Sequence, residues 1–216
     1  MRVSEKLDFI ASVQPYWAER LDPWATGEDA VFVDAPHIPP ALLAGCAILP
    51  HRYDLIAHLP KGGVVAELGT MRGVFARWIL QAARPASLHL FDLDFALLEH
   101  DPLSAALASG QVRLHEGDSA ENLARFPENH FDWIYVDGDH RYDGVVRDIA
   151  AARDRVRPGG FLVFDDYCAF SHRELMPYGV LRAVNEFVIR EQWPARYLAL
   201  DAQGHLNIAL ARPERG

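Results

Sequence analysis

Three aspartates follow two short apolar runs and could together hold a metal cation. Asp137 follows residues 133–136, and Asp165 and Asp166 follow residues 161–164. If the two runs are neighbouring parallel strands about 4.8 Å apart, the three carboxylates lie at one edge of the sheet. Carboxylates so close repel one another unless a cation or protons compensate. Because oxygen ligands suit Mg²⁺ or Ca²⁺ better than zinc, the sequence predicts a magnesium-type site here.

The elements that must position these aspartates are short strands alternating with helices, the rhythm of a parallel sheet. Apolar runs of four or five residues, dense enough for buried parallel strands, occur after residue 60. They cover residues 64–68, 88–91, 112–115, 133–136 and 161–164. Amphipathic segments over 74–83, 143–156 and 178–191 predict helices between and after them.

The C-terminal part of the chain predicts the closing elements of the sheet. Asp143 stands at an N-cap position for the helix over 143–156, and residues 157–160 (Arg-Pro-Gly-Gly) predict the turn that ends it. Residues 195–200 and 205–211 flank a polar turn with glycine and predict an antiparallel hairpin. We therefore expect an α/β fold: a doubly wound, mostly parallel seven-stranded sheet, Rossmann-like, with helices on both faces and a C-terminal antiparallel hairpin.

The loop after the first strand has two glycines with separate expected roles. Gly69 permits a sharp turn out of the strand, and Gly73 lets the next helix start close to the sheet. Backbone N–H groups at that helix start suit an anionic group. A dinucleotide fingerprint needs another glycine where this chain has Met71, which weakens the interpretation as an NAD-dependent oxidoreductase.

The spacing Glu-x-Gly-x-x-x-Gly in this loop resembles the first motif of class I S-adenosylmethionine-dependent methyltransferases. The resemblance extends to the acidic ends of the second and third strands and implies S-adenosylmethionine as cofactor. It places the methionine end of the cofactor at Glu67, Gly69 and Gly73, the ribose at Asp92, and the adenine at Asp118 and Ser119. Thr70 and Leu93 are expected as further cofactor-binding residues. Local alternatives stay open, since Asp92 or Asp94, and Asp118 or Ser119, could instead cap the helices that follow.

The string Val-Asp-Gly-Asp-His-x-Tyr-x-Gly-Val, from residue 136, is similar to metal-dependent O-methyltransferases of the sugar and macrolide type, and more distantly to the catechol type. That resemblance implies Mg²⁺ on Asp137, Asp165 and Asp166. It also makes His140, or Asp137 itself, the candidate general base. The implied acceptor is a hydroxyl of a small molecule such as a sugar, a glycoside or a catechol-like ring. His140 could equally be an ordinary loop histidine, whereas Asp139 and Asp143 are interpreted as turn and cap residues.

Composition excludes several classes of function. Of 216 residues, 21 are Lys or Arg and 30 are Asp or Glu, a formal charge of −9, which argues against a nucleic-acid partner. Residues 38–50 form the longest uncharged apolar stretch, too short and proline-rich for a membrane span. Two cysteines and a charged N-terminus favour a cytoplasmic protein. We expect a methyltransferase domain over 61–216, preceded by a helical or irregular segment over 1–60 that acts as a substrate lid or a homodimer contact.

Two further alternatives remain open at this stage. One is a metal-independent N- or carboxyl-methyltransferase of the same fold, in which the aspartates only orient the substrate. The other is a non-catalytic member that uses the fold as a binding module, although such a module has no need of acidic residues at every strand end.

Overall fold

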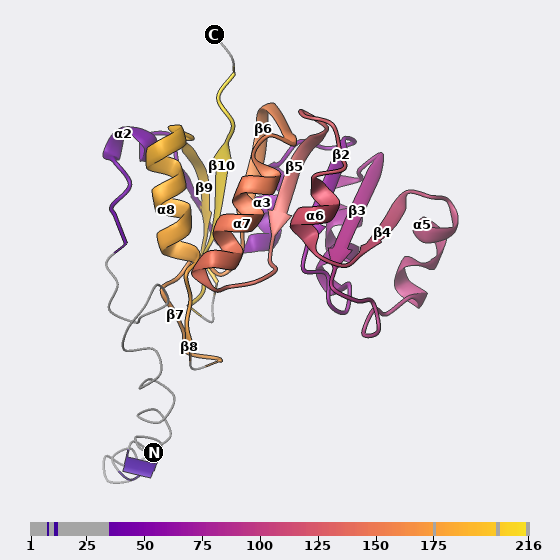
Figure 1. The fold of residues 1–216 in the computed structure, drawn as a ribbon, viewed down its shortest axis with the longest axis horizontal. Helices are drawn as coiled ribbons and strands as arrows, with labels where there is room; N and C mark the ends of the chain where they lie inside the picture. Colours follow the sequence, from indigo (N-terminus) through magenta and orange to yellow (C-terminus); the bar gives the residue numbers. More distant parts are fainter. Residues whose placement is uncertain (1–7, 9–10, 13–34, 175, 202–203, 215–216) are drawn as a thin grey trace.

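The computed structural model describes residues 8, 11–12, 35–174, 176–201 and 204–214, and its centre is one eight-stranded sheet (Figure 1). The strand order is β1-β9-β10-β6-β5-β2-β3-β4. The strands from β2 to β6 pair with one another in parallel. β1 is parallel to β9, and β10 is antiparallel to both β6 and β9. The strands are β1 (Ala47–Leu49), β2 (Val64–Leu68), β3 (Ser87–Asp92), β4 (Val112–Glu116), β5 (Phe131–Val136), β6 (Val156–Phe164), β9 (Ala195–Ala199) and β10 (Asn207–Ala211).

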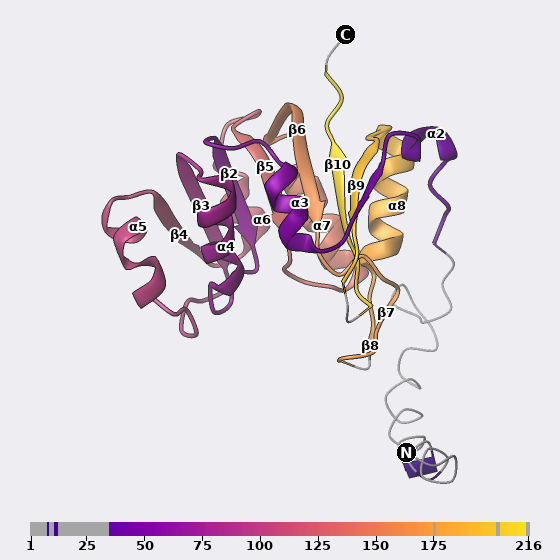
Figure 2. The same cartoon turned by 180° about the vertical axis from the view of Figure 1, so that it is seen from behind.

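Helices cover both faces of the sheet. One face carries α6 (Ser119–Leu123), α7 (Tyr142–Ala152) and α8 (Val180–Glu191), as Figure 1 shows. The opposite face, seen in Figure 2, carries α3 (Arg52–His58) and α4 (Val74–Ala83). Shorter elements are α2 (Pro40–Leu43), the 3₁₀ turn η2 (Asp101–Leu103), α5 (Ser104–Ala108) and a separate two-stranded ribbon of β7 (Phe170–Ser171) and β8 (Met176–Pro177). The expected doubly wound α/β fold is confirmed.

Side-chain alternation along the strands divides the core into two layers. In β5, Ile134 and Val136 belong to the cluster that includes α7 and α8 residues. Trp133 and Tyr135 belong to the cluster on the α3 and α4 side. Because successive strand residues point to opposite faces, a strand apolar throughout is the expected pattern for a sheet covered on both sides.

The sheet has eight strands where the sequence predicts seven. The additional strand is β1, which pairs with β9 through three residues, Ala47 with Tyr197 to Leu49 with Ala199. Three residues are too few to show a strand period, so the sequence gives no signal for it. β1 and α3 thus pack on the sheet, although both lie within residues 1–60. Trp17 and Trp24, aromatic residues of that segment, lie outside the described residues.

The predicted turn over 157–160 is wrong, because these residues belong to β6. Phe131 pairs with Val156 and Trp133 already pairs with Phe161, so the intervening β6 residues form a bulge. Gly159 adopts φ 73° there. The extra residues of a bulge make no hydrogen bonds to the neighbouring strand. A proline and a glycine with positive φ are therefore tolerated there.

The helix predicted over 143–156 ends earlier than expected and has a different cap. α7 spans Tyr142–Ala152, its N-cap residue is Arg141, and Asp143 lies exposed in the first turn. The predicted hairpin is present as β9 and β10, although residues 202–203 of its turn lie outside the described residues.

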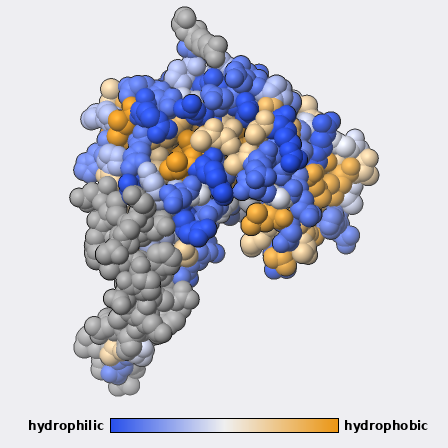
Figure 3. Space-filling view, in the orientation of Figure 1, coloured by the Kyte–Doolittle hydropathy of each residue, from blue (hydrophilic) through white to orange (hydrophobic). Residues whose placement is uncertain are grey.

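The surface in the orientation of Figure 1 is largely hydrophilic, with hydrophobic side chains gathered toward the α5 end of the sheet (Figure 3). Two of the most exposed large hydrophobic residues, Leu93 at 75% and Leu97 at 65%, belong to the loop after β3. None of the helices in the described part of the chain has the length and apolar character of a membrane span.

Candidate functional site

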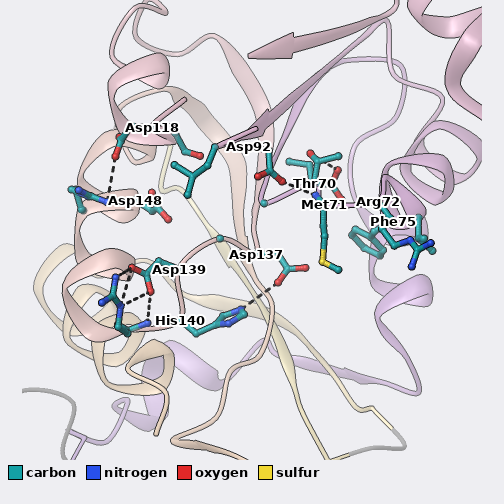
Figure 4. Close-up of a pocket in the computed structure, with 18 of the residues that line it drawn as sticks. Thr70, Met71, Arg72, Phe75, Asp92, Asp118, Asp137, Asp139, His140 and Asp148 are labelled. Carbon is teal, nitrogen blue, oxygen red and sulfur yellow. Dashed lines mark hydrogen bonds and ion pairs between the residues drawn. The ribbon is translucent and has the colours of Figure 1, made fainter. Parts of the chain in front are cut away.

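A cavity of about 710 Å³ opens at the carboxyl ends of the central strands (Figure 4). It lies where the chain order reverses, since β2 has β3 on one side and β5 on the other. Open α/β sheets bind ligands at such a switch point, and the volume suits a small molecule. Its walls come from the loops after β2, β3, β4 and β5, from α7 and from Arg52 at the start of α3. Every cofactor residue expected from the sequence except Gly73 lines this cavity: Glu67, Gly69, Thr70, Asp92, Leu93, Asp118 and Ser119.

The two glycines after β2 are required for different reasons. Gly69 has φ 84°, and a Cβ there would overlap the carbonyl oxygen of Asp137. Gly73 has φ 73° and is the N-cap residue of α4, and a Cβ there would come within 2.8 Å of the Leu98 side chain. The expected sharp turn at Gly69 is confirmed, whereas Gly73 allows close packing against the loop after β3 rather than against the sheet.

Glu67 is a buried carboxyl at the floor of the cavity. It is 1% exposed, and the Thr70 hydroxyl donates to its Oε2 over 3.1 Å. Burial raises the pKa of Glu67 well above its ordinary value, and the nearby Asp137 carboxylate raises it further. A neutral or hydrogen-bonded Glu67 could therefore receive a donor group of a ligand.

Asp92 holds the loop after β2. Its Oδ2 accepts from the Met71 backbone N–H over 2.6 Å, which ties the ends of β2 and β3 together (Figure 4). Asp94 accepts from the backbone N–H of Ala96 over 2.9 Å, as a turn-capping residue does. Neither Asp92 nor Asp94 caps a helix, because the next helical element begins only at Asp101; Asp94 closes a turn, and Asp92 lines the cavity.

Asp118 is committed to the protein itself. It is the N-cap of α6, where its Oδ1 accepts from the Glu121 N–H over 3.0 Å. Its Oδ2 lies 3.4 Å from Nη2 of Arg147. The cap alternative therefore describes what Asp118 does in this structure, although Asp118 and Ser119 both line the cavity.

The structure brings together Asp137, His140 and Asp166. His140 Nε2 lies 3.4 Å from Asp137 Oδ1 and 3.6 Å from Asp166 Oδ2. One potential ligand atom from each of the three residues lies within 4.8 Å of the others. The side chains are 17–24% exposed, so the group is accessible from the cavity edge. Two predicted metal ligands and the predicted base therefore converge at the ends of β5 and β6.

Asp165, the third predicted ligand, is turned to a different partner. Its Oδ2 accepts from Nη1 of Arg52 over 2.7 Å, and its side chain is only 6% exposed. The guanidinium also lies 5.0 Å from the Phe75 ring centroid, and its buried Nε has no partner among the described residues. Sequence reasoning missed Arg52, because nothing in the spacing connects residues 113 positions apart.

Asp166 is fixed by a second residue that the sequence left unassigned. His205 is 4% exposed, and its Nδ1 lies 2.6 Å from Asp166 Oδ1, which leaves Oδ2 toward His140. Asp166 has φ 49°, so its side chain leaves the strand at an unusual angle. The signal for His205 was available in principle, since an antiparallel β10 beside β6 brings residues 205–206 opposite 166.

Charge repulsion and burial keep protons on this group. Burial raises the pKa of Asp137 to about 8, the Asp165 carboxylate adds to the rise, and His140 opposes it. Burial lowers the pKa of His140, but hydrogen bonding to Asp137 and the charges of Asp137 and Asp166 outweigh that effect and raise it overall. Asp137, His140 and Asp166 therefore share protons near neutral pH, and a bound cation could replace those protons.

The comparisons with known proteins all find similarity to methyltransferases. Residues 66–167 match the family model described as a methyltransferase domain. A Mycolicibacterium paratuberculosis protein, provisionally named an O-methyltransferase, is 28% identical over 145 residues, 64% of this chain and 60% of its own length. A protein of Mycobacterium sp. strain JLS with the same provisional name is 29% identical over 147 residues, 64% of this chain and 61% of its own. The chain thus spans about 60% of the length of these curated relatives.

The solved structures that resemble the chain share its fold at low sequence identity. An O-methyltransferase family protein from Burkholderia thailandensis has a TM-score of 0.57 at 13% identity, over 76% of this chain and 56% of its own. The pyocyanin biosynthetic protein PhzM has a TM-score of 0.57 at 20% identity, over 74% of this chain and 53% of its own. Residues 66–167 thus match a methyltransferase domain, and the fold is shared with solved methyltransferase structures. The cavity at the switch point is the candidate active site.

Proposed function

We propose that the chain is a class I methyltransferase that transfers the methyl group of S-adenosylmethionine to a hydroxyl of a small molecule. The observation that carries the proposal is the convergence of Asp137, His140 and Asp166 at the edge of the cavity that holds the expected cofactor residues. The provisional O-methyltransferase names of the mycobacterial relatives support oxygen as the acceptor.

The reaction is a direct displacement. A bond forms between the acceptor oxygen and the methyl carbon as the carbon–sulfur bond breaks, and the sulfur keeps the electron pair as S-adenosylhomocysteine leaves. The main demand on the protein is alignment of oxygen, carbon and sulfur, with the reacting atoms about 3 Å apart. The acceptor proton goes to the pair of His140 and Asp137, the two candidate bases, whose Nε2 and Oδ1 lie 3.4 Å apart. The ring of His140 is held by stacking on Tyr178, with centroids 4.4 Å apart.

The donor set fits a magnesium ion. Asp137 and Asp166 present carboxylate oxygens to one point, and such oxygens are the ligands Mg²⁺ prefers. When bound, Mg²⁺ would lower the pKa of the acceptor hydroxyl and neutralise the carboxylates. Asp165 would join as the third ligand only if it separated from Arg52.

The ion pair between Arg52 and Asp165 favours a second candidate, a metal-independent methyltransferase of the same fold. Arg52 gives the aspartates an internal positive charge 2.7 Å from Asp165, which reduces the need for a cation. In that case Asp137 and Asp166 would orient a nitrogen or carboxyl acceptor.

The two candidates separate in a methyl-transfer assay on hydroxyl, amine and carboxyl acceptors, with and without EDTA. The magnesium-assisted O-methyltransferase predicts hydroxyl turnover that EDTA abolishes and Mg²⁺ restores, together with loss of turnover in Asp166→Asn. Asp139→Asn, which changes a neighbouring aspartate held by Arg141, is the matched control and should keep its turnover. EDTA-insensitive turnover would leave the methyltransferase and remove the metal.

We also propose a cytoplasmic enzyme that acts on a small molecule without a nucleic-acid or membrane partner. The net charge of −9 supports this assignment. The N-terminal segment is proposed to cover the acceptor or to join two subunits.

A further inference from the structure

Asp148 is a buried carboxyl that faces the cavity without a partner among the described residues. It lies on α7, is 6% exposed and lines the cavity. Its carboxylate makes no hydrogen bond or ion pair with the described residues. Figure 4 places it on the α7 wall between Asp118 and Asp139. Because its oxygens open on the cavity and no described residue bonds to them, they are available to a donor group of a ligand.

The burial of the Asp148 carboxylate shifts its pKa. Burial raises the pKa of Asp148 to about 7, the charges of Asp118 and Asp139 raise it, and Arg147 opposes them. A buried carboxyl that gains nothing within the protein destabilises the fold. A ligand donor would remove that cost.

A glycine lies beside the carboxylate of Asp148 at the cavity wall. A Cβ at Gly138 would come within 3.3 Å of Asp148 Oδ2, so the carboxylate lies beside the bare α-carbon of Gly138. Gly138 itself lines the cavity. The family resemblance assigns the adenine to Asp118, yet both oxygens of Asp118 are engaged, by the Glu121 N–H and by Arg147. Asp148 is the neighbouring carboxylate that remains available.

We propose that Asp148 accepts a hydrogen bond from the exocyclic amine of the cofactor's adenine and thereby selects adenine over hypoxanthine. The inference rests on the proposed use of S-adenosylmethionine and adds a specificity-determining residue to it. Adenine carries an N–H donor at this edge, whereas hypoxanthine carries a carbonyl acceptor that repels a carboxylate. An asparagine can turn its amide and donate to that carbonyl.

The test is calorimetric titration with S-adenosylhomocysteine and S-inosylhomocysteine, which needs neither acceptor nor turnover. The wild-type protein should prefer the adenosyl compound, and Asp148→Asn should reduce that preference by about tenfold or more, the worth of one hydrogen bond to a charged group. Asp148→Ala should weaken adenosyl binding without gaining inosyl binding. Asp139→Asn, on the same wall, should keep the wild-type preference.

Asp118→Asn separates the two carboxylates, since asparagine caps a helix as well as aspartate does. An unchanged preference in Asp148→Asn, with the change appearing in Asp118→Asn, overturns the assignment. Because no described residue pairs with Asp148, Asp148→Asn should unfold in urea no earlier than the wild type, so a loss of binding cannot be ascribed to misfolding. Failure of wild-type protein to bind either compound would refute the proposed function and this assignment with it, whereas binding with an unaltered preference refutes the assignment alone.

Discussion

Arg52 connects the N-terminal part of the chain to the candidate site, and its replacement by methionine tests that connection. Arg52→Met removes the 2.7 Å hydrogen bond to Asp165 and leaves a carboxylate with a 6% exposed side chain uncompensated. It also removes the guanidinium carbon that lies 5.0 Å from the Phe75 ring centroid, while methionine keeps an unbranched apolar side chain. The change therefore removes the charge and its hydrogen bond with little loss of apolar volume.

The expected loss follows from the burial of the two partners. Breaking a fully buried ion pair costs about 3–5 kcal/mol. Arg52 is 29% exposed, so the expected loss in the free energy of unfolding for Arg52→Met falls to about 2–3 kcal/mol. Asp165→Asn should cost less, about 1 kcal/mol, because the remaining guanidinium can reach solvent.

Urea unfolding followed by circular dichroism, on both single variants and the double variant, measures the coupling. The double variant should recover about 1–2 kcal/mol relative to the sum of the single losses. Additive losses, with a coupling under about 0.5 kcal/mol, would refute the view that the pair stabilises this edge of the sheet. Adding Mg²⁺ extends the assay, because a cation that takes Asp165 as a ligand should stabilise Arg52→Met more than the wild type.

Two further predictions concern the sheet and its first loop. His89 is 2% exposed, and burial lowers its pKa to about 4, so protonation favours the unfolded chain. The contribution of His89 to the free energy of unfolding is complete above pH 6.5 and falls by about 2 kcal/mol by pH 5. His89→Gln should flatten that part of the pH dependence in a series of urea unfolding curves. A slope unaltered by the substitution would remove His89 as its source. Gly69→Ala should abolish S-adenosylhomocysteine binding or folding, because a Cβ would overlap the Asp137 carbonyl oxygen. Gly62→Ala is its control, with φ 73° but open space, and should cost only about 1 kcal/mol; equal effects of the two glycine changes would contradict the steric argument.

Much of the fold follows from local patterns in the sequence. The run over 64–68 coincides with β2, and the helix expected over 74–83 coincides with α4. These elements are buried on one or both faces, so their apolar period is complete. β1 and the bulge in β6 were missed because three residues show no period and because a Pro-Gly-Gly sequence usually ends a strand.

The candidate site was predictable where it depends on strand ends and not where it depends on tertiary pairing. Asp137 and Asp166 converge because their strands are neighbours, as a βαβ order implies. Arg52 lies on α3, outside the predicted strands, so no strand pattern connects it with Asp165. His205 meets Asp166 through the antiparallel pairing of β10 with β6, and the sequence predicted the hairpin without fixing that neighbour.

The most direct test of the account is a calorimetric titration of metal-stripped protein with S-adenosylhomocysteine, followed by Mg²⁺. The account predicts micromolar binding of the nucleoside, a separate Mg²⁺ isotherm, and loss of that isotherm in Asp166→Asn with nucleoside affinity retained. Nucleoside binding without any Mg²⁺ isotherm would contradict the magnesium site and favour the metal-independent enzyme. If the nucleoside does not bind, the proposed methyl transfer is wrong.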